Sequence, residues 1–434
     1  MLRTVLTLSL FLSVSWRIFC FASPDTIRVM HYNLLNYRNT TGQCTNSTNN
    51  PDDKDGYLST IVHSVMPDVI TVNEMGAHWL NPNKILTNAL NVDGVTHFDQ
   101  MEFTNNSFSS LTNMLFFNTE KLVKHKQEVI GKSIGGQELV RVTDVYTLYY
   151  KDEIALLRGD TTFLTFMVVH LKAGSGSDDK VERALQTEAI MDFVEKNKTI
   201  ENYFICGDFN IQTHSEACYK NMVSHSDVNI KFIDPIDAAG SWNNNSNYAN
   251  VHTQSTHVTD TRGGCFSSGG MDDRFDFVLC GKEVMDNKYG VQLVLGSYKA
   301  LGQDSRRFNG DMSSPDNSLV SKTVSNALYN MSDHLPVLVD VAIDQKGLGV
   351  DGLSAQRVLF TIQKADEIKV FWKNVKISKL EVVDMTLKSV YVNEQIGEHT
   401  EQVISKNTLS PGTYIIFATD QNNAVYQRKI ILTR

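Results

Sequence analysis

The sequence predicts an α+β fold in which two sheets pack into a sandwich, followed by a small β-sandwich at the C-terminus. Strand-like apolar runs outnumber helical patterns in residues 23–343. Many of these runs end in a polar residue or lie next to one, which indicates that polar strand ends gather along one edge of the sandwich. Residues 344–434 instead contain short strand-like runs at regular spacing, the pattern of a separate small β-domain.

Apolar periodicity predicts the elements of the first part. Continuous or alternating apolar runs predict strands at 27–33, 68–74, 114–117, 143–150, 161–170, 203–206, 274–280 and 333–341. Apolar residues three and four positions apart predict helices at 57–66, which Pro67 ends, and at 180–196. Three polar segments, 36–56, 241–270 and 302–318, are expected to be loops.

The last part of the chain follows a glycine-containing linker with Gly347, Gly349 and Gly352. Six short runs predict strands, at 358–362, 368–372, 380–383, 389–392, 412–418 and 425–432. No catalytic residue types cluster here. We interpret residues 344–434 as a β-sandwich that serves attachment or sorting.

The N-terminus has the pattern of a secretory signal peptide. An early basic residue, Arg3, is followed by an apolar run and then by small residues, so residues 1–22 are expected to be removed by cleavage after Ala22. No other stretch approaches the roughly 20 apolar residues that a membrane-spanning helix needs. The mature protein is therefore expected to be secreted or attached to the cell surface, without a transmembrane helix.

The remaining cysteines do not form a metal-binding pattern. None stands in a CxxC pair, so structural zinc is not expected. Export permits disulfides, and Cys218 and Cys265 lie in loop-like sequence and could pair. Cys206 and Cys280 stand inside apolar strands and are expected to be buried.

The charge of the chain limits the partners that it can bind. The formal net charge is −9, and residues 344–434 contain slightly more basic than acidic side chains, so the excess of acid lies before them. A broad basic surface for polyanions is therefore disfavoured. A phosphate-rich substrate would have to be bound locally, by a cation and a few arginines.

The polar residues at the strand ends include several that can carry chemistry. They are Asn33, Glu74, His170, Asp208, Asn210, Asp276, Asp333 and His334. A carboxylate such as Glu74 suits a hard divalent cation, and His334 can remove a proton from water if Asp276 fixes its tautomer. Each residue alone is explained as readily by a turn, a cap or a surface position, but together they predict metal-assisted phosphoester hydrolysis.

Six of these segments, in this order, resemble motifs of the endonuclease/exonuclease/phosphatase superfamily. They are Met30–Asn33, Pro67–Glu74, His170–Lys172, Gly207–Asn210, Arg274–Leu279 and Ser332–Val337. Each motif alone is weak, whereas the ordered set is specific and covers roughly residues 25–343. The resemblance implies a four-layered α/β sandwich, with two packed, mainly antiparallel sheets flanked by helices.

The resemblance also implies roles for individual residues. Glu74 would hold a divalent ion with the help of Asn33, and Asp333 would lie beside this metal. Mg²⁺ is the expected ion, with Mn²⁺ or Ca²⁺ as alternatives.

The remaining motif residues are assigned to the reaction itself. His334, oriented by Asp276, would be the general base that activates water. Asp208 and Asn210 would position the nucleophile and the phosphate, and His170 would bind the phosphate and stabilise the transition state. Arg141 stands outside these motifs and could contact the phosphate or be a solvated surface arginine.

The C-terminal part resembles the sorting domains of the type IX secretion system of Bacteroidetes. The resemblance rests on the segment Leu409–Ile416 and on the last strand, which ends at Arg434. It implies that the export machinery of the outer membrane recognises this part. The proline-rich opening typical of such domains is absent here.

We expect a secreted, monomeric phosphodiesterase, an endonuclease acting on extracellular DNA or RNA. A sphingomyelinase-like lipid phosphodiesterase, or another phosphatase of the superfamily, is the alternative within this class. The lipid activity needs an exposed apolar loop, and the long loops contain only isolated aromatics, Trp242, Tyr248 and Phe266. A non-catalytic surface binding protein that retains the fold is the third possibility.

Overall fold

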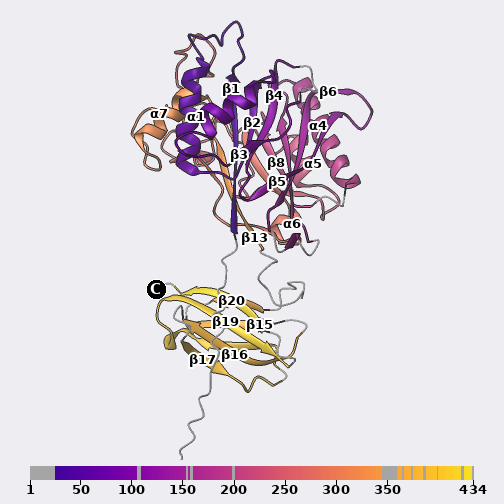
Figure 1. The fold of residues 1–434 in the computed structure, drawn as a ribbon, viewed down its shortest axis with the longest axis vertical. Helices are drawn as coiled ribbons and strands as arrows, with labels where there is room; N and C mark the ends of the chain where they lie inside the picture. Colours follow the sequence, from indigo (N-terminus) through magenta and orange to yellow (C-terminus); the bar gives the residue numbers. More distant parts are fainter. Residues whose placement is uncertain are drawn as a thin grey trace, which may run out of the picture. The chain divides into compact units, whose positions relative to one another are not determined.

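The computed structural model describes two compact units (Figure 1). The first comprises residues 25–104, 109–152, 155–156, 160–197 and 201–344. The second comprises residues 359–363, 366–372, 375–384, 388–397, 399–421 and 425–432. The predicted signal peptide and the glycines of the predicted linker lie outside the described residues.

Two mixed sheets form the centre of the first unit. The first sheet has the order β11 (Val291–Leu293), β13 (Val337–Ile343), β1 (Asp25–Tyr37), β2 (Val69–Gly76), β4 (Leu111–Asn118) and β3 (Phe98–Gln100), and β12 (Lys299–Ala300) also pairs with β13. The second has the order β5 (Leu122–Lys132), β6 (Glu138–Tyr150), β7 (Phe163–His170), β8 (Tyr203–Asp208), β10 (Asp276–Gly281) and β9 (Phe232–Ile233).

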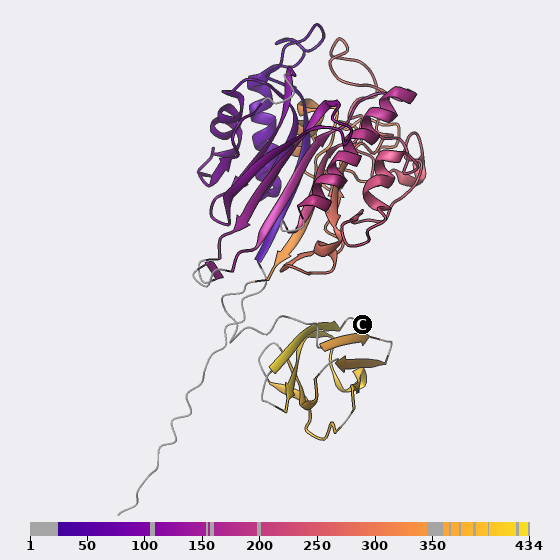
Figure 2. The same cartoon turned by 90° about the vertical axis from the view of Figure 1, so that its right-hand side faces the viewer.

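Helices cover the outer face of each sheet. The helices described in this unit are α1 (Pro51–Val65), α2 (Asn81–Ile85), η1 (Leu86–Leu90), α4 (Ser177–Lys196), α5 (Ala217–Val223), η2 (Ser246–Tyr248), α6 (Lys282–Met285) and α7 (Lys322–Met331). Figure 2 shows α1, in indigo, on one side of the two sheets and α4, in magenta, on the other. The fold is therefore an α/β sandwich of four layers, as predicted.

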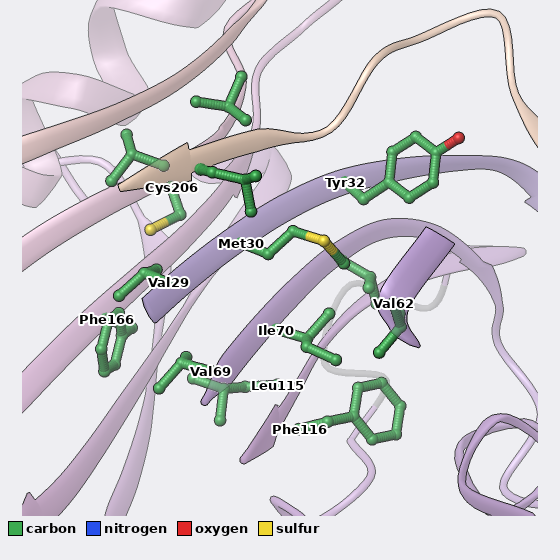
Figure 3. Packing of buried hydrophobic residues seen from close by; sticks show 14 of the residues in the cluster. Val29, Met30, Tyr32, Val62, Val69, Ile70, Leu115, Phe116, Phe166 and Cys206 are labelled. Atoms are coloured by element: carbon green, nitrogen blue, oxygen red, sulfur yellow. The ribbon is translucent and has the colours of Figure 1, made fainter. Parts of the chain in front are cut away.

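The alternation of side chains along β1 explains how these layers pack. Val29 lies beside Phe166 and Cys206 of the second sheet, whereas Met30 points toward Val62 of α1 (Figure 3). Both Val29 and Met30 are fully buried, because β1 is covered on both faces. Burial on both faces also explains why this strand lacks a clean alternation of apolar and polar residues.

The strand pairing brings the predicted polar strand ends together. Most pairs are antiparallel, but β1 pairs with β2, and β7 with β8, in parallel. In these pairs Asn33 lies opposite Asn73 and His170 lies opposite Asp208. The antiparallel strand β10 begins with Asp276, which also lies opposite Asp208. The carboxyl ends of four strands and the start of a fifth therefore share one edge.

The short elements α2, η1, α5, η2, α6, β3, β9, β11 and β12 were not predicted, and three longer elements also differ from the expectation. Helix α1 begins at Pro51, inside the segment predicted as a loop, because Asn50 caps it by accepting the N–H groups of Asp52 and Asp53. Strand β5 was not predicted, since its middle is exposed and charged. Helix α7, capped by Ser321, was also not predicted. No helix in the described ranges has the length and apolar character to cross a bilayer.

The second unit is a small β-sandwich. One sheet has the order β14 (Leu359–Gln363), β15 (Glu367–Trp372) and β18 (Glu401–Ser405). The other has the order β17 (Ser389–Asn393), β16 (Ile377–Asp384), β19 (Gly412–Asp420) and β20 (Val425–Leu432), and a 3₁₀ turn, η3 (Lys406–Thr408), precedes β19. Apolar residues of both sheets, among them Trp372 and Ile416, form its core. Strand β18 was not predicted.

A disulfide joins two loops of the first unit. It links Cys44 to Cys265, 221 residues away, so the pairing of Cys218 with Cys265 that the sequence left open is not made. Cys218 is a buried free thiol in α5, and Cys206 and Cys280 are buried free thiols in strands. The buried indole of Trp242 contacts the ring of Tyr219, which follows Cys218 in α5, with ring centroids 5.5 Å apart.

Candidate active site

The polar residues predicted from the sequence converge at the shared edge of the two sheets. Their positions are Asn33 in β1, Glu74 in β2, His170 in β7, Asp208 in β8, Asn210 just after it, Asp276 in β10, and Asp333 and His334 just before β13. Glu74 and Asn210 are partly exposed, and the other six are buried. The site thus draws on both sheets and on five different strands.

His334 and Asp276 form a buried dyad. Nδ1 of His334 lies 2.7 Å from Oδ2 of Asp276, whose own backbone N–H donates to Oγ1 of Thr253. Burial lowers the pKa of His334, but the carboxylates of Asp276, Asp208 and Asp333 outweigh burial and raise this pKa well above its usual range. With Nδ1 donating to Asp276, Nε2 is the ring atom left to exchange a proton.

Several polar groups lie near Nε2 of His334, and three of them are within 3.8 Å. The side-chain amide nitrogen of Gln254 lies 2.7 Å away, that of Asn33 lies 3.5 Å away, and Oδ2 of Asp208 lies 3.8 Å away. Gln254 was not identified from the sequence, because it stands in a polar loop and belongs to no motif. It reaches the dyad because its backbone bridges both Asp273 and His334.

Glu74, His170 and Asp208 form a second cluster next to the dyad. Nε2 of His170 lies 3.7 Å from Oε1 of Glu74 and 3.6 Å from Oδ2 of Asp208. One potential ligand atom from each residue lies within 4.8 Å of the others, which suits a single metal ion. Burial is the main cause that lowers the pKa of His170 well below its usual range, and the nearby charge of Arg141 lowers it further. The imidazole is therefore neutral and able to bind a cation.

Asn33 connects the two carboxylates of this cluster. Its Nδ2 atom donates to Oε1 of Glu74 and to Oδ2 of Asp208, both at 3.1 Å. Its Oδ1 atom accepts the N–H of Leu35. In this arrangement Asn33 orients the carboxylates with its donor group, while its oxygen fixes the turn that follows β1.

The backbone conformation at the site is unusual. Glu74 has φ 58° and Asn210 has φ 51°, both in the left-handed region. Asparagine tolerates this region, but for glutamate it is uncommon, and such strain is typical of functional sites. Glu74 is held there because its Oε2 atom accepts the backbone N–H of Asn36 at 3.0 Å.

Asp208 is held by hydrogen bonds from both sides. Its N–H donates to Oδ1 of Asn73, and its Oδ1 atom accepts the N–H of Asn210. Burial raises the pKa of Asp208 to about 7, and the neighbouring carboxylates of Asp276 and Glu74 add to this effect. A bound cation would oppose the shift, because it stabilises the ionised carboxylate.

Asp333 lies on the dyad side of the site. Its Oδ2 atom accepts the N–H of Ser267, and its Oδ1 atom lies 4.0 Å from Nε2 of His334. This Oδ1 atom is buried without a hydrogen-bond partner among the described residues. A buried carboxylate oxygen of this kind is costly unless a cation or a donor from the substrate meets it.

Arg141 belongs to the site and is not a solvated surface residue. Nη1 of Arg141 donates to the backbone oxygen of Leu171 at 2.9 Å, and the residue lines the same pocket as Glu74 and His170. Burial lowers the pKa of Arg141, while the carboxylates of Asp208 and Glu74 oppose this effect. The guanidinium thus places a fixed positive charge beside the cluster.

A buried lysine supports the turn after β1. Nζ of Lys54 donates to the backbone oxygens of Leu34 and Leu35, each at 2.7 Å, and to Oδ1 of Asn49 at 2.8 Å. This turn carries the N–H of Asn36 that holds Glu74. This role was not predicted, because Lys54 lies in the segment 36–56 that was expected to be a loop.

Neither a protein-family model nor a curated protein matches the sequence. Similar solved structures include the catalytic domain of human Nocturnin, which is 15% identical in sequence. The match covers 74% of this chain and 97% of the Nocturnin chain, with a TM-score of 0.44. An endonuclease/exonuclease/phosphatase family protein from Bacteroides thetaiotaomicron is 13% identical, with coverages of 76% and 99% and a TM-score of 0.45. A mannosyl-6-phosphatase from the same organism is 14% identical, with coverages of 73% and 100% and a TM-score of 0.43.

Proposed function

We propose that the first unit is a metal-dependent phosphoester hydrolase of the endonuclease/exonuclease/phosphatase superfamily. The observation that carries this proposal is the buried His334–Asp276 dyad, whose Nε2 faces the cluster of Glu74, His170 and Asp208. A structural histidine would not need a buried carboxylate behind it and a second acidic cluster in front of it. General-base catalysis beside a cation site needs both.

The donor set fits a divalent cation. Carboxylate oxygens of Glu74 and Asp208 are hard ligands of the kind that Mg²⁺ and Mn²⁺ bind, and His170 completes the group. Asn33 and Asp333 would act around this ion, one by orienting the carboxylates and the other through its unpartnered Oδ1 atom. When bound, the cation would offset charge on the oxygens of the phosphate.

The residues of the chain would then act as follows. A cation held by Glu74 and Asp208 would oppose the rise that the carboxylates cause in the pKa of His334. Nε2 of the neutral imidazole then takes a proton from a water molecule, whose oxygen forms a bond to phosphorus. The bond from phosphorus to the leaving oxygen breaks, its electron pair stays on that oxygen, and a solvent proton neutralises it. Asp276 remains ionised and stabilises the imidazolium. Asn210, His170 and Arg141 would hold the phosphate oxygens as charge builds on them.

We propose that the substrate is nucleic acid. The protein would be exported and would act as an endonuclease on extracellular DNA or RNA. A partly buried arginine beside the cluster, Arg141, supports local capture of one backbone phosphate without a broad basic surface. The N-terminal signal pattern supports export. For the C-terminal unit we propose sorting or attachment through the type IX secretion machinery.

The second candidate is a lipid phosphodiesterase, and one observation favours it. Of the aromatics considered for membrane docking, Trp242 and Phe266 are buried. The loop after β2, however, exposes Trp79 to 63% and Leu80 to 38%. This pair stands only a few residues beyond Glu74, where an apolar side chain could enter a lipid surface or stack on a base.

Incubation with plasmid DNA, RNA, sphingomyelin vesicles and bis(p-nitrophenyl) phosphate, with Mg²⁺ or with chelator, tests the proposal. Cleavage of a nucleic acid with Mg²⁺ and none with chelator is expected. Cleavage of sphingomyelin alone would favour the lipid enzyme, and no cleavage with Mg²⁺, Mn²⁺ or Ca²⁺ would refute the hydrolase.

Replacing Glu74 tests the cation site separately. Glu74→Gln should raise the Mg²⁺ concentration needed for half-maximal activity by about tenfold or more, because it removes a charged ligand. Calorimetric titration with Mg²⁺ alone should show the same loss. An unchanged metal requirement would exclude Glu74 as a ligand.

A further inference from the structure

A pocket opens beside the proposed phosphate site, between β4 and β6. Its lining includes three residues of the proposed active site, Glu74, Arg141 and His170. The other lining residues have no role in the chemistry described above. The polar ones are Thr112, Asn113 and Asp144, and the apolar ones include Leu111 and Val142. The pocket thus combines a polar wall with apolar carbon surface.

Asp144 is the most unusual group in this pocket. Its side chain is buried, and the residue is only 2% exposed. Its Oδ2 atom accepts a hydrogen bond from Nδ2 of Asn113 at 2.9 Å, and the hydroxyl of Thr104 is its other partner. Both partners are neutral, and no cationic side chain of the described residues compensates the carboxylate. Burial therefore raises the pKa of Asp144 to about 7.

A chain of hydrogen bonds fixes Asp144 as an acceptor. The N–H of Asp208 occupies Oδ1 of Asn73, so the Nδ2 atom of Asn73 is the donor to Oδ1 of Asn113 at 2.7 Å. The Nδ2 atom of Asn113 must then be the donor to Asp144. The same chain connects the wall of the pocket to the backbone of a residue in the proposed active site.

The direction of attack places the leaving group on the side of this pocket. Attacking and leaving oxygens lie roughly in line on opposite sides of the phosphorus. Water activated by His334 approaches from the dyad side, and Oδ2 of Asp208 lies 3.8 Å from Nε2 of His334 and 3.6 Å from Nε2 of His170. The leaving oxygen therefore points past His170 and Glu74, toward the pocket that they line.

We propose that this pocket receives the sugar of the leaving group, and that Asp144 accepts a hydrogen bond from the hydroxyl next to the leaving oxygen. The inference rests on the proposed function and names its substrate class: a ribonucleotide linkage, whose 2′-hydroxyl is vicinal to the leaving 3′-oxygen. Leu111 and Val142 suit the carbon face of a ribose ring. An ammonium group is disfavoured, because Arg141 and the cation site stand beside the pocket.

The test compares three dinucleoside phosphates that differ only at the 2′ position of the leaving nucleoside. They carry a hydroxyl, a hydrogen, or a fluorine, which cannot donate a hydrogen bond. With Mg²⁺, the wild-type protein should cleave the ribo form with a kcat/KM about tenfold or more above that of the other two. The products should be a 5′-phosphate and a free 3′-hydroxyl.

Variants assign the preference to Asp144. Asp144→Asn turns the acceptor into a donor at nearly constant shape, and the ratio of ribo to deoxy kcat/KM should fall toward one. Asp99→Asn, which changes a half-exposed carboxylate in β3, should keep the wild-type ratio. Circular dichroism checks the fold, and the wild-type comparison decides the matter even if Asp144→Asn does not fold.

The possible failures are distinguishable. If bis(p-nitrophenyl) phosphate is hydrolysed but the three dinucleoside phosphates react equally, or the deoxy form reacts faster, the pocket proposal is wrong and the hydrolase stands. A 2′,3′-cyclic phosphate product would also overturn it, because the 2′-oxygen would then be the nucleophile. If nothing is hydrolysed, both proposals fail.

Discussion

At the scale of single residues, the dyad is the part of the site that the chemistry depends on most. His334→Gln removes the proposed base at similar size, and kcat should fall by about 1,000-fold, since general-base catalysis contributes on this order. Asp276→Asn should also lower kcat strongly, because the imidazole loses the carboxylate that stabilises its charged form. The measurement is the initial rate on bis(p-nitrophenyl) phosphate with Mg²⁺.

The control for this prediction is His214→Gln, which changes an exposed histidine outside the site. Its kcat should equal that of the wild type. If His334→Gln keeps more than about a tenth of the wild-type kcat while folded, His334 is not the base.

Gln254 gives a second prediction at this scale. Its amide nitrogen lies 2.7 Å from Nε2 of His334, so it stands beside any water that this ring atom activates. Gln254→Ala should lower kcat by about tenfold and leave KM nearly unchanged, because it removes a group that orients the water and not the phosphate. Gln137→Ala, in the exposed turn between β5 and β6, is the matched control. A change in KM alone would assign Gln254 to substrate binding.

Some residues of the site could be predicted from the sequence and others could not, for a physical reason. Glu74, Asp208 and His334 stand at or next to the ends of apolar runs in the sequence, so the position of each could be predicted from its neighbours in the chain. Gln254 contacts His334, which is 80 positions away in the sequence, and Lys54 contacts Leu34, which is 20 positions away. No local sequence pattern predicts contacts over such separations. Asn73, which holds the N–H of Asp208, stands next to Glu74 but reads as an ordinary strand residue.

At the scale of elements, the segment around His257 ties the long loop to helix α7. The ring of His257 stacks on Tyr329 of α7 with centroids 3.9 Å apart, and Nδ1 lies 2.9 Å from Oγ1 of Thr256. Burial lowers the pKa of His257 to about 4, although Asp311 and Asp333 raise it and Arg262 lowers it. Between this value and the unfolded value near 6.5, the unfolded chain binds more protons.

A pH-dependent loss of stability follows from this difference. The free energy of unfolding should fall as pH decreases from about 6.5 toward 4, as far as His257 contributes. His257→Phe keeps the stacking on Tyr329 but cannot be protonated, so its stability relative to the wild type should improve by about 1 kcal/mol or more between pH 7 and pH 5. Urea unfolding at both pH values measures this. Equal shifts of both proteins with pH would contradict it.

The elements themselves were predicted where their burial is uniform. The central strands β1, β2, β7 and β8 are buried on both faces, so apolar runs marked them. Strand β5 was not predicted, because its middle, with Lys124 and Lys126, faces solvent at the edge of its sheet. The start of α1 was not predicted, because its first turn is polar and depends on the cap from Asn50.

At the scale of the whole molecule, the chain separates the chemistry from the C-terminal unit. Among the residues that the structure describes, the core of the first unit contains none beyond Ile343, and the second unit has a core of its own. All the residues of the proposed site lie in the first unit. Each unit thus has what an independently folding domain needs.

A chain truncated after Asp344 tests this separation. Because the site draws only on strands and loops of the first unit, the truncated protein should keep kcat/KM on bis(p-nitrophenyl) phosphate within about twofold of the full chain. The full chain and the truncated chain, each expressed with the N-terminal segment in a Bacteroidetes host, should differ in location: only the full chain should reach the cell surface or the medium. Retained export of the truncated chain would show that residues 344–434 do not sort the protein, and lost activity with a native unfolding transition would show that they contribute to the site.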